Sequence, residues 1–130
     1  MYRGVLIPVI TPFFEDNSVD EPVLRQLVDF YVEASVQGLF ALGSSGQGPV
    51  LAADERKAIA EIILDQAGGR TPVIIHVGCA DTPTTVELAK HAAASGADAI
   101  GIIPPYYYCD APKSAILEHF NAVSDAAALP

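Results

Sequence analysis

Residues 39–48 read Leu39-Phe40-Ala41-Leu42-Gly43-Ser44-Ser45-Gly46-Gln47-Gly48, an apolar run followed at once by a glycine-rich turn. The apolar part predicts a buried parallel strand, and a helix is expected after the turn, from about Asp54 to Ala67. A glycine-rich turn between a strand and a helix exposes backbone N–H groups beside the positive end of the helix dipole. The hydroxyls of Ser44 and Ser45 add donors, so the turn is suited to hold a small anion, either a carboxylate or a phosphate.

The form of this turn does not choose between those anions. It lacks the Gly-Lys-Ser/Thr ending of a phosphate-binding P-loop, and its spacing differs from the dinucleotide fingerprint. The alternative interpretation is a tight connection that needs glycine only for its dihedral angles.

The composition predicts one soluble, cytoplasmic domain, residues 1–130. The chain has 130 residues with 51% hydrophobic side chains, no apolar run near the length of a membrane span and no signal-type N-terminus. Sixteen acidic residues against seven basic ones give a net charge of −9. Since a negative surface repels phosphate groups, nucleic acid and anionic membranes are not expected as partners.

Cysteine and histidine positions indicate no metal or redox site. Cys79 and Cys109 make no CxxC pair or zinc spacing, although each follows a predicted strand and they should share one rim. His76 lies within a strand and is expected to be a hydrogen-bonded core residue. His91 and His119 lie on predicted helices and are expected at the surface.

Strand and helix patterns alternate along the whole chain. Apolar runs at 5–10, 39–42, 72–77 and 99–103 predict four strands, and helices are expected to begin near Asp20, Asp54, Asp81 and Pro112. Continuous apolar strands indicate a parallel sheet covered on both faces. The loops after the carboxyl ends of the strands would form the ligand-binding edge.

Two α/β architectures fit this pattern equally. One is a self-contained, flavodoxin-like doubly wound sheet of four parallel strands. The other is the first four βα units of a (β/α)8 TIM barrel, which needs roughly 250 residues when complete. Leu129-Pro130 resembles the entry to a fifth strand.

Four short motifs occur together in a family-like order. They are Thr11-Pro12-Phe13, Gly43-Ser44-Ser45-Gly46, Asp54-Glu55-Arg56 and Pro105-Tyr106-Tyr107. In order and spacing the chain resembles the N-terminal half of the dihydrodipicolinate synthase and N-acetylneuraminate lyase family of pyruvate-dependent class I aldolases. The resemblance implies lyase chemistry through a Schiff base between a lysine and pyruvate or a related 2-oxo acid, with no cofactor.

The resemblance also implies roles for individual residues. Ser44 and Ser45 match the hydroxyl residues that bind the substrate carboxylate, and Ser44 can also link to the proton relay. Tyr107 matches the catalytic tyrosine that relays protons, reaching across a dimer interface; the alternative for Tyr107 is interface packing alone. Tyr106 and Tyr108 are interpreted as packing or rim residues. Gln47 departs from the family glutamate at that position.

The resemblance places the Schiff-base lysine on a sixth strand, which this chain does not contain. Its lysines are Lys57, Lys90 and Lys113, all on predicted helices or a helix start. We therefore expect the 130-residue chain alone to be inactive. It would be the substrate-binding half of an aldolase that forms a homo-oligomer, either a dimer or a tetramer. The resemblance does not decide whether the second substrate is an aldehyde of lysine biosynthesis or a sugar acid. The alternatives are a non-catalytic module that binds a small anion and an inactive half barrel that pairs with a second copy.

Overall fold

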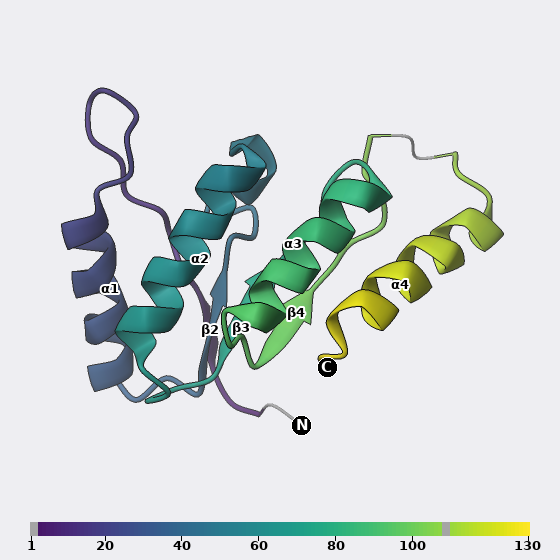
Figure 1. Ribbon diagram of the computed structural model, residues 1–130. Coiled ribbons are helices and arrows are strands. Elements are labelled where there is room, and N and C mark those ends of the chain that lie inside the picture. The colour runs from purple at the N-terminus through teal and green to yellow at the C-terminus, as the bar shows by residue number, and fades with distance from the viewer. Residues whose placement is uncertain (1–2, 108–109) are drawn as a thin grey trace.

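The structure is a computed structural model that describes residues 3–107 and 110–130. Its sheet contains four parallel strands in consecutive order, which are β1 (Leu6–Pro8), β2 (Gly38–Ala41), β3 (Val73–His76) and β4 (Ala99–Gly101). Strands β1, β3 and β4 are shorter than their apolar runs, and β2 ends one residue before its run, because the last apolar residues already belong to the loops at the carboxyl edge (Figure 1).

Four helices follow the strands in turn, with one 3-10 turn between β2 and its helix. They are α1 (Glu21–Glu33), η1 (Gly48–Val50), α2 (Ala53–Ala67), α3 (Thr82–Ala94) and α4 (Lys113–Ala127). Asp20 caps α1 by accepting a hydrogen bond from the backbone N–H of Val23, and Asp81 caps α3 in the same way from Thr84. The predicted helix starts at Asp20 and Asp81 are therefore confirmed.

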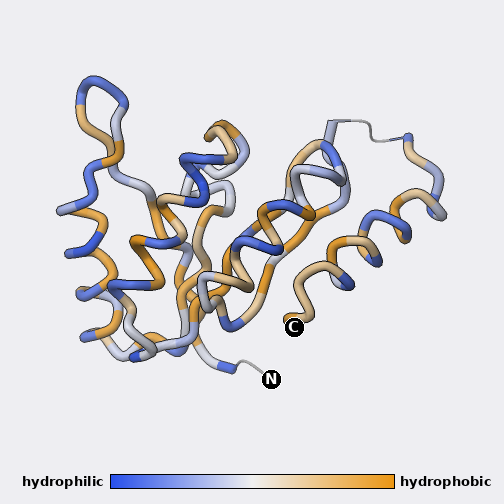
Figure 2. The backbone as a smooth tube through the Cα atoms, viewed as in Figure 1, coloured by the Kyte–Doolittle hydropathy of each residue, from blue (hydrophilic) through white to orange (hydrophobic). Residues whose placement is uncertain are grey.

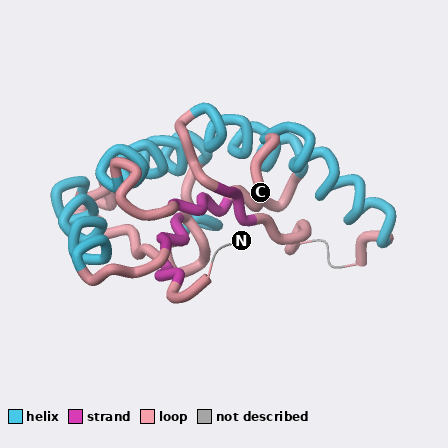
Figure 3. The backbone as a smooth tube through the Cα atoms, turned by 90° about the horizontal axis from the view of Figure 1, so that it is seen from below, coloured by secondary structure: helices cyan, strands magenta, loops and turns pink. Residues whose placement is uncertain are grey.

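All four helices lie along one side of the curved sheet (Figure 3). Successive helices pack against each other in the order α1, α2, α3 and α4. A flavodoxin-like sheet reverses its strand order and carries helices on both faces. The consecutive order and the single helical layer therefore exclude that alternative, and the fold is the N-terminal half of a TIM barrel.

The main core lies between the sheet and this helical layer. Figure 2 shows that hydrophobic residues recur along both the strands and the helices. Leu24 and Val28 of α1 and Ile59 and Ile63 of α2 are buried there together with Leu39 of β2. Burial of such aliphatic side chains contributes about 1.5–3 kcal/mol each. This layer accounts for the helical spacing of apolar residues in the sequence.

No helix within residues 3–107 and 110–130 covers the opposite, concave face of the sheet, so the expectation of two covered faces is wrong for this chain. Leu39 and Ala41 point into the helical layer, and the alternation of a strand places Phe40 on the concave face. Leu6 and Phe40 fill the space beside two glycines of neighbouring strands. A Cβ atom at Gly38 would meet Leu6 at 2.6 Å, and one at Gly101 would meet Phe40 at 2.8 Å.

The chain returns to the sheet after α4. The backbone N–H of Ile100 in β4 donates to the carbonyl oxygen of Pro130 at 3.0 Å. Residues 129–130 therefore lie at the free edge of β4, where a next parallel strand would pair, as the sequence indicated. Within the described ranges, no helix is long and apolar enough to cross a membrane.

Candidate active site

The turn after β2 is closed by its own backbone. The carbonyl oxygen of Gly43 accepts hydrogen bonds from the N–H groups of Gly46 and Gly48, both at 3.1 Å, and Gln47 donates to Ser44 at the same distance. These three N–H groups are consequently not available to a ligand. The N–H groups of Ser44 and Ser45 make no backbone hydrogen bond to any described residue.

Glycine is required at two positions of this turn by close approach of other backbone atoms. A Cβ atom at Gly46 would lie 2.8 Å from the carbonyl oxygen of Val9, and one at Gly48 would overlap the carbonyl oxygen of Leu42. The left-handed conformations fall instead on Leu42 and Gln47, with φ of 61° and 59°. The alternative that glycine serves the dihedral angles is therefore wrong here, since its function is to admit close packing.

A buried side chain from the loop after β1 fixes the turn from outside. Thr11 is 5% exposed, and its hydroxyl donates to the carbonyl oxygen of Gly46 at 2.7 Å. This bond joins the first and second loops of the carboxyl edge. The sequence marked Thr11 only as part of a motif; its contribution to the site is that it holds the serine turn in place.

Ser44 and Ser45 border a small hollow between the ends of β1 and β2. Its volume is about 130 Å³, below the ~300–1,000 Å³ of a drug-sized pocket, so it suits a ligand of few atoms. We call it the serine hollow; it is lined by Pro8, Phe40, Gly43, Ser44, Ser45 and Gly46. A lining that combines two serines with apolar side chains suits a short carboxylic acid.

The N-terminus of α2 does not face the serine hollow. The 3-10 turn η1 separates the serine turn from α2, and Gln47 and Glu55 line a different hollow of about 380 Å³ together with Phe13, Asn17, Val50 and Leu51. The Glu55 carboxylate accepts a hydrogen bond from the N–H of Ala52 at 2.8 Å. The expected contribution of the helix dipole to anion binding is therefore not found beside the serines.

Tyr107 lies in the loop after β4, at the same carboxyl edge as the serine turn. Its side chain is 74% exposed, and that of Tyr106 is 42% exposed. The strand order places β3 between the strands that lead to Ser44 and to Tyr107. Tyr108 and Cys109, which the sequence placed on this rim, lie outside the described residues.

Arg56 of α2 is a buried residue whose role sequence reasoning missed. It is 3% exposed, and its guanidinium donates to the carbonyl oxygens of His76 and Gly78 at 2.7 and 3.1 Å and to the Sγ of Cys79 at 3.0 Å. It thus joins α2 to the loop after β3. An arginine at helical spacing among apolar residues was the available signal.

The three histidines occupy different environments. His76 is 5% exposed, as expected of a core residue, but its buried Nδ1 has no hydrogen-bond partner among the described residues. Burial, and to a lesser extent the nearby Arg56, lower its pKa. His119 was expected at the surface but is 2% exposed, because α4 packs this position against α3, where its Nδ1 lies 2.9 Å from the Thr82 hydroxyl. His91 is partly exposed and contacts Glu61.

The three lysines lie on helices, as predicted. Lys57 belongs to α2, and its pKa is raised by hydrogen bonds to Glu87 and Asp54. Lys90 belongs to α3 and Lys113 begins α4. A raised pKa keeps the Lys57 amine protonated at neutral pH, the opposite of what a nucleophile requires.

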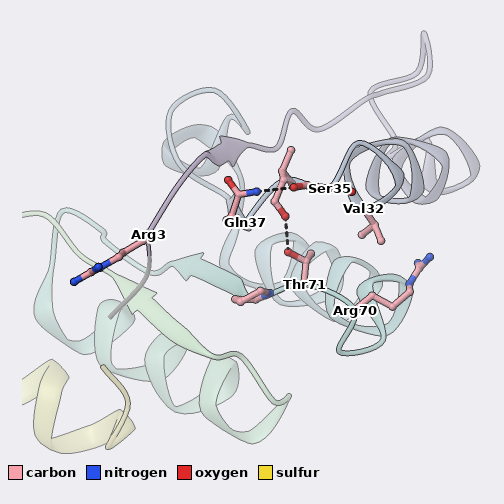
Figure 4. A pocket seen from close by; sticks show the side chains of 8 residues that line it. Arg3, Val32, Ser35, Gln37, Arg70 and Thr71 are labelled. Carbon is pink, nitrogen blue, oxygen red and sulfur yellow. Dashed lines mark hydrogen bonds between the residues drawn. The ribbon is translucent and has the colours of Figure 1, made fainter.

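A further hollow, of about 630 Å³, lies at the amino ends of the strands (Figure 4). Two side chains that line it are held by hydrogen bonds to the backbone. The Gln37 side-chain amide donates to the carbonyl oxygen of Ser35 at 2.6 Å, and the Thr71 hydroxyl donates to that of Val36 at 3.2 Å. The Arg70 guanidinium forms an ion pair with the Asp29 carboxylate. This hollow is at the edge opposite the serine turn, and in α/β barrels that edge contributes stability rather than chemistry.

Four consecutive parallel βα units, with a small hollow at the carboxyl edge of the sheet, define half of a (β/α)8 barrel. The model of the dihydrodipicolinate synthetase family matches residues 1–130. The chain belongs to this family.

Individual relatives are similar over the whole chain. YagE of Escherichia coli (strain K12) is 39% identical over all 130 residues, and its structure in complex with pyruvate superposes with a TM-score of 0.97. A 4-hydroxy-tetrahydrodipicolinate synthase of Acidiphilium cryptum is 36% identical over 130 residues, and an N-acetylneuraminate lyase of Rhizobium meliloti is 38% identical over 128. The chain spans 43%, 44% and 42% of these relatives, respectively.

Replacing Arg56 by methionine should lower the free energy of unfolding by about 2 kcal/mol or more. The carbonyl oxygens of His76 and Gly78 would lose their partner in a buried place, at a cost of about 1–3 kcal/mol for each unsatisfied group. Arg56→Lys should restore only part of the loss, because one ammonium does not reproduce the planar guanidinium. Urea unfolding followed by circular dichroism measures this, and an Arg56→Met variant as stable as the wild type would contradict it.

The stability of the fold should decrease as the pH falls below about 6.5, in part because of His76. Its pKa in the fold lies below the ordinary value of 6.5, so in this range the unfolded chain binds a proton that the folded chain does not. His76→Gln should therefore lose less stability than the wild type between about pH 7.5 and 5.5 in urea titrations. His91→Gln, at a partly exposed histidine, is the control and should keep the decrease.

Proposed function

We propose that residues 1–130 form the N-terminal half of a pyruvate-dependent Schiff-base aldolase domain of this family. The observation that carries the proposal is the serine hollow, which Ser44 and Ser45 line together with the apolar Pro8 and Phe40. This arrangement suits a short 2-oxo acid with its carboxylate on the serines. It agrees with the bound pyruvate named for the structure of YagE.

The reaction step assigned to this half is positioning and proton transfer. Ser44 and Ser45 would orient the carboxylate so that the keto carbon lies next to an amine. Such orientation of reactants lowers the activation free energy of the reaction substantially. The phenol of Tyr107 would pass protons as the carbinolamine forms and loses water, with the Ser44 hydroxyl as its neighbour in the relay. No metal or cofactor is required for these steps.

The amine would come from outside residues 1–130. Lys57, Lys90 and Lys113 lie on helices of the outer layer and not on the concave face. The proposal therefore needs further strands that close the barrel against β1 and β4. Homo-oligomer formation through the Tyr107 loop and a cytoplasmic location belong to the same proposal, and the second substrate, an aldehyde of lysine biosynthesis or a sugar acid, depends on the rest of the barrel.

Residues 1–130 alone should form no covalent adduct when treated with pyruvate and borohydride. A complete protein that extends beyond Pro130 should gain the mass of reduced pyruvate on a lysine of the added part. Mass spectrometry of peptide digests measures both results. A mass increase on Lys57, Lys90 or Lys113 would contradict the proposal, as would a complete protein that forms no adduct.

In the complete protein, Tyr107→Phe should slow adduct formation by about 100-fold, the usual scale of a lost proton relay. Tyr106→Phe is the matched control and should leave the rate near that of the wild type. Ser44→Ala and Ser45→Ala should each raise the pyruvate concentration needed for half-maximal rate by about tenfold, since a hydrogen bond to a charged group is lost. Equal effects of the two tyrosine substitutions would argue against the relay.

A further inference from the structure

Phe40 forms the apolar floor of the serine hollow. It belongs to β2, three residues before Gly43, and lines the hollow with Pro8 and residues 43–46. Because Leu39 and Ala41 point into the helical layer, the Phe40 ring is directed to the concave side of the sheet. A ligand carboxylate on Ser44 and Ser45 would place its carbon chain against this ring.

Two glycines make room for the ring. A Cβ atom at Gly43 would lie 3.0 Å from Cε1 of Phe40, and one at Gly101 would lie 2.8 Å from Cε2 and 2.9 Å from Cζ. Distances of this size leave no space for even one methyl group. The ring is therefore held from the serine turn above it and from β4 beside it.

His76 contacts the Phe40 ring from β3. Its imidazole lies at a centroid distance of 6.0 Å from Phe40 and at an interplanar angle of 52°. The imidazole is itself confined, because a Cβ atom at Gly78 would meet its Cε1 at 3.0 Å and its Nε2 at 3.1 Å. The ring therefore has neighbours on β3, on β4 and in the serine turn, which restrict its movement on these three sides.

We propose that Phe40 is a specificity-determining residue, whose fixed ring limits the serine hollow to 2-oxo acids with a very short carbon chain. The inference rests on the proposed function, since it assumes that a 2-oxo acid binds with its carboxylate on the serines. It adds the size limit of the substrate and the residue that sets it. A hydrophobic pocket distinguishes ligands that differ by one methylene by roughly 10–200-fold, so a single side chain is sufficient for such selection.

The test compares pyruvate with 2-oxobutanoate and 2-oxopentanoate in the complete protein. The rate of borohydride-trapped adduct formation at several concentrations gives an apparent second-order rate constant for each acid. The wild type should favour pyruvate strongly, whereas Phe40→Leu and, more so, Phe40→Ala should shift the ratio toward the longer acids by about tenfold or more. Leu6→Ala, at the amino end of the same concave face and outside the hollow, is the matched control and should keep the wild-type ratio.

A second variant reaches the ring from the opposite side. Gly101→Ala would press its methyl group on Phe40, so we expect a lower rate with pyruvate. The double variant Phe40→Leu with Gly101→Ala should recover much of that rate, because the smaller side chain leaves space for the methyl group.

Each outcome bears on a different claim. Ratios unchanged within about twofold in Phe40→Leu, or the same shift in Leu6→Ala, would overturn the inference while the proposed function stands. A wild-type protein that forms no adduct with any of the three acids would overturn the proposed function and the inference with it. Absence of recovery in the double variant would contradict the inference, because it would show that the contact between Gly101 and Phe40 does not control the hollow.

Discussion

The close packing of the turn 43–48 against the ends of β1 and β2 is the constraint on which the site depends. Gly46 lies against the carbonyl oxygen of Val9, and Gly48 against that of Leu42. The hydrogen bond from Thr11 to Gly46 adds a polar tie to the same place. Because these contacts are made by backbone atoms, the positions of the two serines follow from the sheet itself rather than from side-chain packing. A loop held this tightly can present small donors with little freedom to lose on binding.

Much of the fold could be predicted from the sequence, because each strand and helix carries its own local signal. The apolar runs, the helix starts at Asp20 and Asp81 and the end of α2 at Ala67 all appear where expected. Periodicity could not show whether helices cover one face or two, since Phe40 and Ile74 are apolar for the concave face just as Leu39 and Ile75 are for the helical face. The family resemblance, and not the pattern, indicated the half barrel.

The sequence predicted the residues of the candidate site better than the hydrogen bonds and burial of those residues. Ser44 and Ser45 border a hollow, as the turn chemistry suggested, but the N–H groups expected to serve a ligand at positions 46–48 are bonded within the turn. The buried positions of Arg56 and His119 depend on contacts between elements that are distant in sequence, Arg56 with the loop after β3 and His119 with α3. Charge and helical position alone favoured solvent for both residues, and tertiary packing reversed that preference.

The bond between Ile100 and Pro130 has a consequence for chain growth at the sheet edge. A parallel strand that continues from this point inherits its alignment from one hydrogen bond, because a slip of a single residue would exchange inward and outward side chains along its whole length. This hydrogen bond therefore defines the register of a parallel strand that pairs with β4 at this edge. A misaligned strand would lose this hydrogen bond at its first residue, before its apolar side chains are buried.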